Sequence, residues 1–499
     1  MNEPPLVSLP MRRPHWVGVL SPLSALCGER QMLWGGCGIA LCLAVMSAVS
    51  FLRAILDGHL DPDNSNLPLT GYLLVVLPIA GAQLLSGWLF MKAWAGASQL
   101  SWKRIWAVAL LIHVCAAAAL PLSSNDIYSN LANGKLWAEG LNPYLHTPAE
   151  LGPGSPFQPL VPEMWRGVTA PYGPMVLYFS RLATQTGGLW SSILAFKLQA
   201  TAVSLVSVLL ALGYCRQCLP AEAARRSFLF VAWNPLVAWE LTGQAHNDVL
   251  LVAGTTAFIW AASRNREWLA GLLISGAFCA KFAVAPLIGL YGIYVLRRSP
   301  ARGLGLLACL AGVCGLLFAP LWAGMRTFDG VWFEASSPPW HVCQSLVSVL
   351  MTVARLVNPD WTLGAYWLWT LPCKIGMALL ALGLAWRTRT LEQVLAGGML
   401  FLFLYQCLAM GWFFPWYVTW LFPLAMARGD KNWQFLVAVY SILAPIVYIP
   451  EDGMLLGALA LHAVPLVLLW RQRRKAGREE SPAGVDSRLP LPDSLPLAA

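Results

Sequence analysis

Charged residues are scarce in this chain. Only 11% of its 499 residues are charged, whereas 58% are hydrophobic. A soluble protein of this length needs more charged side chains to cover its surface, so the composition excludes that class. The net charge of +9 would suggest a nucleic-acid partner in a soluble domain, but here the basic residues flank apolar runs. We therefore expect a polytopic membrane protein whose partner is the lipid bilayer and not a nucleic acid.

Sequence signatures of soluble catalytic domains are also missing. The chain has no Walker A motif, no G-x-G-x-x-G after a strand and no serine-hydrolase elbow. Most of its twelve cysteines lie inside apolar runs, and the C-x-x-C of Cys215 and Cys218 has no second pair, so no disulfide framework or redox motif is predicted. Without a nucleotide-binding domain, an activated substrate should be carried by the membrane itself.

Long apolar runs recur along the chain, for example LWGGCGIALCLAVMSAVSFL and GYLLVVLPIAGAQLLSGWLF. Each is close to the roughly 20 residues that cross a hydrocarbon core as a helix. The runs are continuous and do not alternate between polar and apolar residues, which favours helices over strands. The sequence therefore predicts an all-α polytopic membrane protein with about fourteen transmembrane helices.

The basic residues predict how the chain is oriented. With Arg12 and Arg13 in the cytoplasm, the loops that carry the other basic clusters fall on the same side. These clusters are Lys103 and Arg104, Arg216, Arg225 and Arg226, Arg264 and Arg266, Arg297, Arg298 and Arg302, Arg387 and Arg389, and Arg428 and Lys431. Nearly every polar or aromatic cluster then lies on the extracytoplasmic face of the inner (plasma) membrane.

This orientation divides the chain into three regions. Residues 1–30 are expected to be a cytoplasmic segment with no removable signal peptide, because no short apolar core there ends in a cleavage site. Residues 31–472 form a transmembrane domain with a large extracytoplasmic loop at residues 123–172. Residues 473–499 are rich in Pro and Ser without periodicity, which predicts a disordered cytoplasmic tail.

The first candidate site residue is Asp126, in SSNDIYSN at the outer end of the third apolar run. On a short helix one face would gather a carboxylate and amides, drawn from Asp126, Asn130, and Asn133 or Gly134, with Tyr128 and Lys135 between them. Such a face suits sugar hydroxyls, and the carboxylate can act as general base to one of them. The alternative is that Asp126 is a solvated helix cap.

A loop rich in proline and glycine follows, NPYLHTPAELGPGSPFQPLVPEMWRGVTAPYGP. Loops of more than thirty residues without secondary structure are uncommon unless they are functional. Within it, Arg166 could pair with a phosphate, although a lone arginine in a loop is also explained by solvation. The APYGP segment at its end predicts a rigid turn that re-enters the membrane.

A second polar group lies in VAWNPLVAWELTGQAHNDVLL, at residues 231–251. Pro235 is expected to kink this span, and four polar residues gather at its outer end: Glu240, His246, Asn247 and Asp248. Ionisable groups at that depth are functional candidates, and these could contact a phosphate, a sugar or a divalent metal. A hydrogen-bonded helix corner is the alternative, and the sequence assigns no cofactor and no metal ligand.

Two more segments complete the set of candidates. Lys281 stands inside the apolar stretch GAFCAKFAVAP, so its ammonium must find an anion, such as a lipid phosphate, or extend to the membrane surface. Trp416 and Tyr417 belong to the aromatic segment GWFFPWYVTWLFP. That segment is typical of an interfacial belt, with a stacking platform for a sugar as the second interpretation.

Taken in order, NDIYSNLANGKLWAEGLNPY, YGP, WNPLVAWELTGQAHNDV, the KF at 281–282 and FPWYVTWLFPLA resemble bacterial polyprenol-phosphate-mannose-dependent alpha-1,6-mannosyltransferases of the GT-C superfamily. The resemblance covers most of residues 100–430. It implies a GT-C-like catalytic domain, a polyprenyl-phosphate sugar donor and an extracytoplasmic active site. It also places Asn142, Tyr144 and Tyr172 among the residues that contact substrate.

The resemblance assigns the catalytic carboxylate to Asp126. This residue would take the proton of an acceptor hydroxyl on a glycan or glycolipid while polyprenyl phosphate leaves from the opposite face of the sugar, with inversion. Lys281, His246 and Arg166 are the candidates to stabilise the departing phosphate. Many family members carry the large loop after their first span, whereas two earlier spans precede it here, so the resemblance gives no role to that N-terminal pair.

Other functions fit part of the pattern. GT-C enzymes that transfer arabinose or another sugar, or that glycosylate a protein, share the same architecture. A secondary transporter would need paired charges at the bilayer midplane and an internal repeat, whereas the polar residues here gather at one surface. A membrane scaffold would have no need of Asp126, His246, Asp248 and Lys281 in costly positions.

Overall fold

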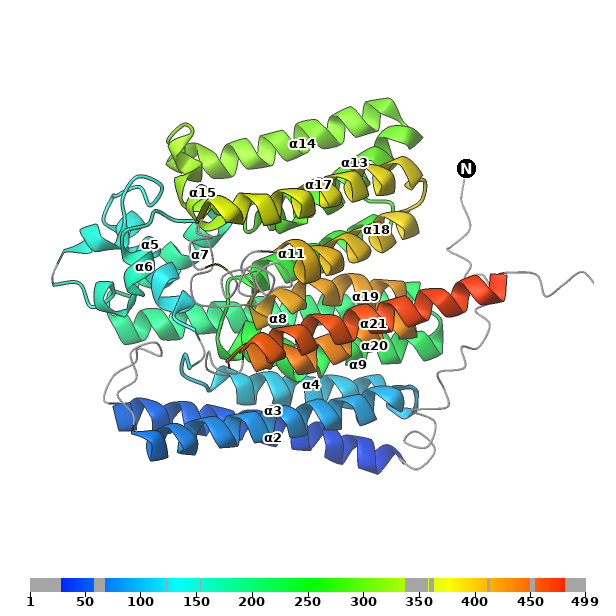
Figure 1. Ribbon diagram of the computed structural model, residues 1–499, viewed down its shortest axis with the longest axis horizontal. Coiled ribbons are helices and arrows are strands. Elements are labelled where there is room, and N and C mark those ends of the chain that lie inside the picture. The colour runs from blue at the N-terminus through cyan, green and yellow to red at the C-terminus, as the bar shows by residue number, and fades with distance from the viewer. Residues whose placement is uncertain are drawn as a thin grey trace, which may run out of the picture.

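The computed structural model describes residues 28–57, 68–122, 124–152, 154–336, 358, 363–410, 413–448 and 454–480. Within these ranges the chain forms helices and no β-strand. The long helices run side by side in a bundle, as Figure 1 shows. The predicted all-α polytopic fold is therefore confirmed, while residues 1–27 and 481–499, parts of the two predicted cytoplasmic ends, lie outside the described residues.

Three N-terminal helices form one edge of the bundle. They are α2 (Glu29–Asp57), α3 (Leu69–Ala95) and α4 (Trp102–Ala117), with the short η1 (Ala97–Gln99) before α4. The Ser47 hydroxyl on α2 donates to the Cys115 carbonyl on α4, 2.8 Å away, which ties these helices together. Leu41, Leu74 and Leu84 are exposed on the outer surface, as expected where a helix faces lipid.

The predicted large loop folds into short helices that cluster at one end of the bundle (Figure 1). They are α5 (Asp126–Ala138), η2 (Pro148–Leu151), η3 (Gln158–Leu160), α6 (Glu163–Arg166) and α7 (Pro174–Thr184). The helices α5 and α7 cross closely at Gly134, where a Cβ atom would lie 2.5 Å from the Ser180 carbonyl carbon. A residue with a side chain at position 134 would push α5 away from the bundle.

The rest of the chain supplies the body of the bundle. Its first part comprises α8 (Leu189–Cys218), α9 (Ala221–Ala232), α10 (Pro235–Val237), η4 (Ala238–Gly243), α11 (Asp248–Ala262), α12 (Glu267–Phe278), η5 (Phe282–Val284), α13 (Ala285–Arg298) and α14 (Pro300–Phe318). Its second part comprises η6 (Ala319–Leu321), η7 (Arg326–Phe328), α15 (Asp329–Ser336), α17 (Leu363–Arg387), α18 (Leu391–Leu404), η8 (Tyr405–Ala409), η9 (Pro415–Leu421), α19 (Phe422–Arg428), α20 (Lys431–Leu443), η10 (Ala444–Tyr448) and α21 (Met454–Glu480).

Five of the described helical segments are long and apolar enough to cross a membrane alone. They are Glu29–Asp57, Leu73–Ala95, Leu189–Cys218, Pro300–Leu321 and Leu391–Ala409. Most of the other predicted spans are shorter or are built from consecutive pieces, because prolines and changes of helix type interrupt them. At the C-terminus α21 continues to Glu480, so the predicted disordered tail cannot begin at residue 473.

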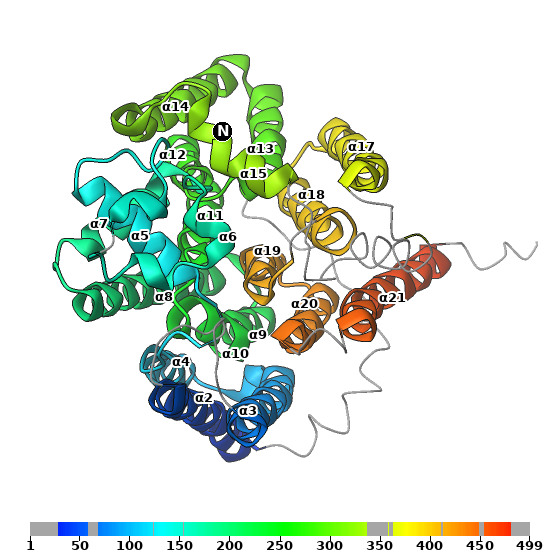
Figure 2. The ribbon, with the colours of Figure 1, turned by 60° about the vertical axis from the view of Figure 1, so that its left-hand side comes forward.

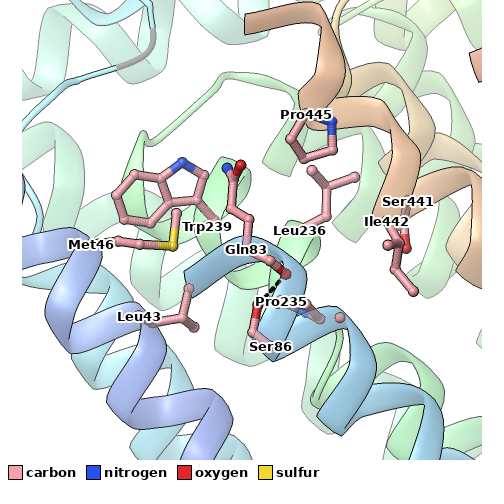
Figure 3. Close-up of a pocket in the computed structure, with 11 residues that line it drawn as sticks. Leu43, Met46, Gln83, Ser86, Pro235, Leu236, Trp239, Ser441, Ile442 and Pro445 are labelled. Carbon is pink, nitrogen blue, oxygen red and sulfur yellow. Dashed lines mark hydrogen bonds between the residues drawn. The ribbon is translucent and has the colours of Figure 1, made fainter. Parts of the chain in front are cut away.

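Pro235 breaks its span completely. The helix α9 ends at Ala232, and α10 begins at Pro235 with Asn234 as its cap, whose side-chain oxygen accepts from the Val237 amide at 3.1 Å. The π-helix η4 follows at once. A small cavity remains where α10 and η4 face α2, α3 and α20, and Figure 3 shows Trp239 of η4 on its wall near Met46.

Several loops with basic residues meet at the opposite end of the bundle from α5. Arg225 and Arg226 at the start of α9 donate to the carbonyls of Ser98 and Gly429, at 2.8 and 3.0 Å. Arg297 at the end of α13 donates to the Thr388 carbonyl at 2.6 Å. Loops that the charge pattern places in the cytoplasm are therefore neighbours in the fold.

Candidate active site

Four segments that are far apart in the sequence converge where α5 meets the bundle. They are the start of α5 at Asp126, the turn between η4 and α11, the connection between α12 and α13 at Lys281, and η9. Figure 2 shows α5, α6 and α7 grouped together at this end of the molecule. The sequence-based expectation that Asp126, His246 and Lys281 lie near one another agrees with this arrangement.

Asp126 begins a chain of three ionisable groups. Its Oδ2 lies 3.3 Å from Nδ1 of His246, and the Nε2 of the same ring lies 3.3 Å from Oε2 of Glu240. Tyr448 donates its hydroxyl to Glu240 at 3.0 Å. The side chains of His246 and Glu240 are buried, whereas 30% of the Asp126 side chain is exposed. Asp126 is therefore the end of this chain that a substrate can reach.

The charges of these groups reinforce one another. Burial raises the pKa of Asp126, but the contact with His246 and the positive charges of His246 and Lys281 outweigh it, so this pKa lies below its ordinary value. Burial would lower the pKa of His246, but its contacts with Asp126 and Glu240 outweigh that effect and raise this pKa to about 9. At neutral pH the centre therefore holds an ionised Asp126 beside a protonated His246.

An unusual backbone holds His246 in place. The preceding η4 is a π-helix, a form that is often found at functional sites. Ala245 then adopts a φ of 56°, a left-handed conformation that is costly for a residue with a side chain. Gln244 fixes the turn, because its Oε1 accepts from the Leu122 amide at 2.7 Å. Leu122 lies in the segment that leads to Asp126. This hydrogen bond therefore fixes the position of that segment relative to the turn that carries His246.

Amide side chains surround the ionisable groups. Asn247 donates to the Asn130 side-chain oxygen at 3.2 Å. Three further polar atoms on these buried asparagines have no hydrogen-bond partner within the described residues: Nδ2 of Asn130, Oδ1 of Asn133 and Oδ1 of Asn247. Buried polar atoms are normally satisfied, so these are free to bind the hydroxyls of a ligand. Asn133 shares the helix face of Asp126 and Asn130, as its spacing predicts.

A second charged pair lies at Lys281. Its Nζ is 2.7 Å from Oδ2 of Asp248, and the indole Nε1 of Trp420 donates to the other carboxylate oxygen at 2.5 Å. The ammonium also lies 5.4 Å from the ring centre of Tyr172 and 4.8 Å from that of Tyr417. Aromatic faces attract a cation, so Lys281 is held within a cage of rings and one carboxylate.

Other parts of the large loop place Tyr172 above Lys281. The neighbouring Gly173 packs so closely that a Cβ atom would lie 2.1 Å from the Cys279 carbonyl oxygen, which explains the glycine. Tyr144 donates its hydroxyl to the Tyr172 carbonyl at 2.9 Å, and Asn142 donates to the Leu321 carbonyl at 2.8 Å. Asn142 and Tyr144, which were expected to contact substrate, use these polar atoms to hold the loop in place.

Two pockets meet at this centre. The first, which we call the polar pocket, contains Asp126, Ser129 and Asn133 from α5, loop residues from Pro148 to Tyr172, and Phe414, Trp416 and Tyr417. The His246 ring stacks on Trp416 with centroids 3.7 Å apart, and Trp416 stacks on Phe414 at 4.4 Å. The aromatic segment thus lines the site and supports His246, beyond any interfacial role.

The second pocket, which we call the apolar groove, has a volume of about 460 Å³. Its walls come from η5 and α13, from α17 and from α18 and η8, and Lys281 lies within it. The residues Pro171, Tyr172 and Tyr417 line both pockets. The two rings of Tyr172 and Tyr417 therefore stand at the border between the groove and the polar pocket.

Three residues predicted to bind substrate lie elsewhere. Tyr128 is fully buried in the core, and Lys135 forms an ion pair with Glu139 at 3.2 Å. Arg166 donates to the Val161 carbonyl at 3.1 Å within its own loop and lines neither pocket. The helical periodicity that grouped Tyr128 and Lys135 with Asp126 did not resolve which face of α5 meets the bundle.

Three further neighbours of this centre, Trp420, Tyr448 and Gln244, were not predicted from the sequence. Trp420 and Tyr448 lie in segments rich in apolar and aromatic residues, and no local sequence pattern distinguishes them from their neighbours. Gln244 stands in TGQAHND, but its link to Leu122 joins positions 122 residues apart. Within the described residues, no group of three or more His, Cys, Asp or Glu side chains is arranged to hold a metal ion.

Comparison with known proteins identifies a family. The model of the family described as alpha-(1->6)-mannopyranosyltransferase, N-terminal domain, matches residues 32–298. Alpha-(1->6)-mannopyranosyltransferase A of Mycobacterium tuberculosis is 26% identical over 365 residues, which are 67% of this chain and 68% of the relative. Alpha-(1->6)-mannopyranosyltransferase B of Corynebacterium glutamicum is 30% identical over 218 residues, 40% of this chain and 35% of the relative.

A further relative, alpha-(1->6)-mannopyranosyltransferase A of Corynebacterium glutamicum, is 29% identical over 175 residues, which are 34% of each chain. No solved structure matches this chain. The family match includes Asp126, His246, Asp248 and Lys281, and it ends before η9 and the C-terminal helices that complete the two pockets.

Proposed function

The chain belongs to the alpha-(1->6)-mannopyranosyltransferase family, and from this we propose that it is a membrane mannosyltransferase that takes its sugar from a polyprenyl phosphate, with Asp126 as general base. The acceptor is a glycan or glycolipid hydroxyl. The active site lies on the extracytoplasmic side of the inner membrane, since many basic loops gather at the other end of the bundle.

The apolar groove fits the donor. A polyprenyl chain needs an apolar channel that is open to lipid, and its phosphate needs a cation at the end of that channel. The groove has apolar walls such as Phe401 and Ala409, and Lys281 lies within it. With the phosphate beside Lys281, the mannosyl group would pass between Tyr172 and Tyr417 into the polar pocket, where Asn133 offers a free side-chain oxygen.

The transfer needs few groups. Asp126 accepts the proton as the acceptor oxygen bonds to the anomeric carbon, and the bond from that carbon to the phosphate oxygen breaks on the opposite face, so the configuration inverts. Negative charge develops on the departing phosphate, and the ammonium of Lys281 stabilises it. His246, held by Glu240, keeps Asp126 ionised and correctly oriented until the acceptor binds.

One observation carries this proposal. Within the described residues, the chain Glu240, His246 and Asp126 is buried at one end and open at the other, and the open carboxylate faces a pocket next to the groove that contains Lys281. A purely structural ion cluster gains nothing from leaving one carboxylate open to a pocket, beside buried amide atoms that have no hydrogen-bond partner within the described residues.

The test is product analysis by mass spectrometry. Membranes with the wild-type chain, supplied with polyprenyl-phosphate mannose and an extract of membrane glycolipids, should form products heavier by one hexose. Asp126→Ala should abolish them, while Asp329→Asn, an exposed carboxylate on α15 outside both pockets, should not. Normal product formation by Asp126→Ala would refute the assignment of the base.

A further inference from the structure

Lys197 is a buried lysine that the proposed mechanism does not use. It lies in α8, one of the long apolar helices, and only 6% of its surface is exposed. Its Nζ donates to the carbonyl oxygen of Gly243 and lies 3.5 Å from that of Thr242. No carboxylate among the described residues forms an ion pair with it, and it lines neither the polar pocket nor the groove.

A lysine in such a place is costly. A charged or polar group buried in an apolar helix must be compensated, and such groups persist where they serve the structure or the function of the site. The two carbonyls are a specific compensation, because Thr242 and Gly243 are the last residues of the π-helix η4. Carbonyls at the end of a helix lack intrahelical donors and favour a cation.

The end of η4 determines where His246 lies. Glu240 is within η4, and His246 follows Gly243 after only two residues, one of them the strained Ala245. A turn with a left-handed alanine needs support from its surroundings. His113 of α4 provides a second contact, since its Nδ1 lies 2.9 Å from the Thr242 hydroxyl. Two buried side chains, Lys197 of α8 and His113 of α4, thus both contact Thr242 at the end of η4.

We propose that Lys197 is a positioning residue for sugar transfer: its ammonium fixes the last carbonyls of η4 and so keeps His246 between Glu240 and Asp126. This inference rests on the proposed role of Asp126 as general base. Lys197 contacts neither reacting group, and it acts only through the turn that follows η4.

The test compares Lys197→Met and Lys197→Gln with Lys103→Met, the last at an exposed lysine on α4. Lys197→Met should lower kcat on the order of tenfold to a hundredfold, as expected for a misplaced catalytic group. The donor KM should stay within about twofold, because the groove and Lys281 are untouched. Lys197→Gln keeps two N–H donors and should retain more of the activity.

A pH profile separates positioning from mere stability. The groups that face Asp126 are His246 and, through charge, Lys281, with Glu240 behind the imidazole. If His246 withdraws, the pKa of Asp126 rises, so the acid limb of kcat should move to higher pH in Lys197→Met. Hydrogen exchange of residues 240–248 should accelerate in the same variant, and neither change is expected in Lys103→Met.

Each outcome decides the inference. A folded Lys197→Met protein with wild-type kcat, an unmoved acid limb and unchanged exchange would overturn it. So would a lower kcat without either of the other two changes. If Asp126→Asn proves active, the proposed function fails on its own, whereas accelerated exchange in Lys197→Met would still show that Lys197 holds the turn.

Discussion

The polar pocket and the apolar groove meet at Tyr172 and Tyr417, yet they differ in almost every property. The pocket holds a partly open carboxylate, Asp126, and the side-chain oxygen of Asn133, which has no hydrogen-bond partner within the described residues. The groove has mostly apolar walls and contains two lysines, Lys374 and the tightly held Lys281. A water-exposed acceptor and a lipid-borne donor need such different surroundings. The contrast supports the proposed transfer from a lipid-borne donor to an acceptor in water.

The two aspartates show the same contrast. Asp248 is buried, and both of its oxygens are used, one by Lys281 and one by Trp420. Asp126 is partly exposed, and one neighbour, His246, holds it from behind. Because both oxygens of Asp248 are already engaged, Asp248 is suited to hold Lys281, whereas Asp126 is the carboxylate that we propose as the base.

The largest effect should come from Asp126. Asp126→Asn removes the base but keeps the shape of the side chain, so kcat should fall about a hundredfold or more, while donor binding is largely kept. Steady-state transfer rates and binding of radiolabelled donor measure the two quantities. Loss of donor binding equal to the loss of kcat would place Asp126 in the donor site instead.

The next largest effect concerns the groove. Lys281→Met should raise the donor KM at least about tenfold, because the phosphate loses its cation. It also leaves Asp248 buried without its partner, which costs about 3–5 kcal/mol of folding stability. The double variant Lys281→Met with Asp248→Asn should recover stability but not donor affinity. Recovery of both would show that Lys281 is purely structural.

A pair of bulky substitutions separates the two pockets. Ala283→Phe lies in the groove and Thr169→Phe in the polar pocket. The first should raise KM for a long-chain donor several-fold, because the larger side chain crowds the groove at a cost of about 1 kcal/mol. The acceptor KM should stay unchanged. The second should do the reverse. Equal effects of both variants on donor and acceptor would mean that the two pockets are not separate binding sites.

The pH dependence follows from the two pKa shifts. Because the pKa of Asp126 is lowered, kcat should stay constant through mildly acidic pH and fall only as the pH drops through that lowered value. A second fall should begin near pH 9, where His246 loses its proton. His246→Gln should move the acid limb to higher pH and remove the basic limb, as pH–rate profiles would show.

The smallest effect should come from Arg166. Its guanidinium donates a hydrogen bond to the Val161 carbonyl, and the residue lines neither pocket. Arg166→Gln should therefore change kcat and both KM values by less than about twofold, since surface changes away from a site matter little. A tenfold rise in donor KM would instead support the contact between Arg166 and the donor phosphate that the sequence predicts.

Composition and periodicity were enough to predict the membrane-bound helical fold and the segments that form the site. Asp126, His246, Asp248 and Lys281 were recognised because ionisable groups beside apolar runs are rare. Their pairing was not predictable: His246 and Asp248 stand two positions apart in the sequence, but they belong to different ion pairs. A left-handed Ala245 and a π-helix decide that separation, and neither has a reliable sequence signal.

By itself the sequence determined that this protein spans a membrane and gathers its polar residues at one end, because hydrophobic burial depends on the order of residue types along the chain. The tertiary structure decided which carboxylate stays open to a pocket. It also decided which tyrosines border the apolar groove and that Lys197 contacts the end of η4. These choices rest on contacts of a few ångströms between distant segments, and local patterns do not encode such distances.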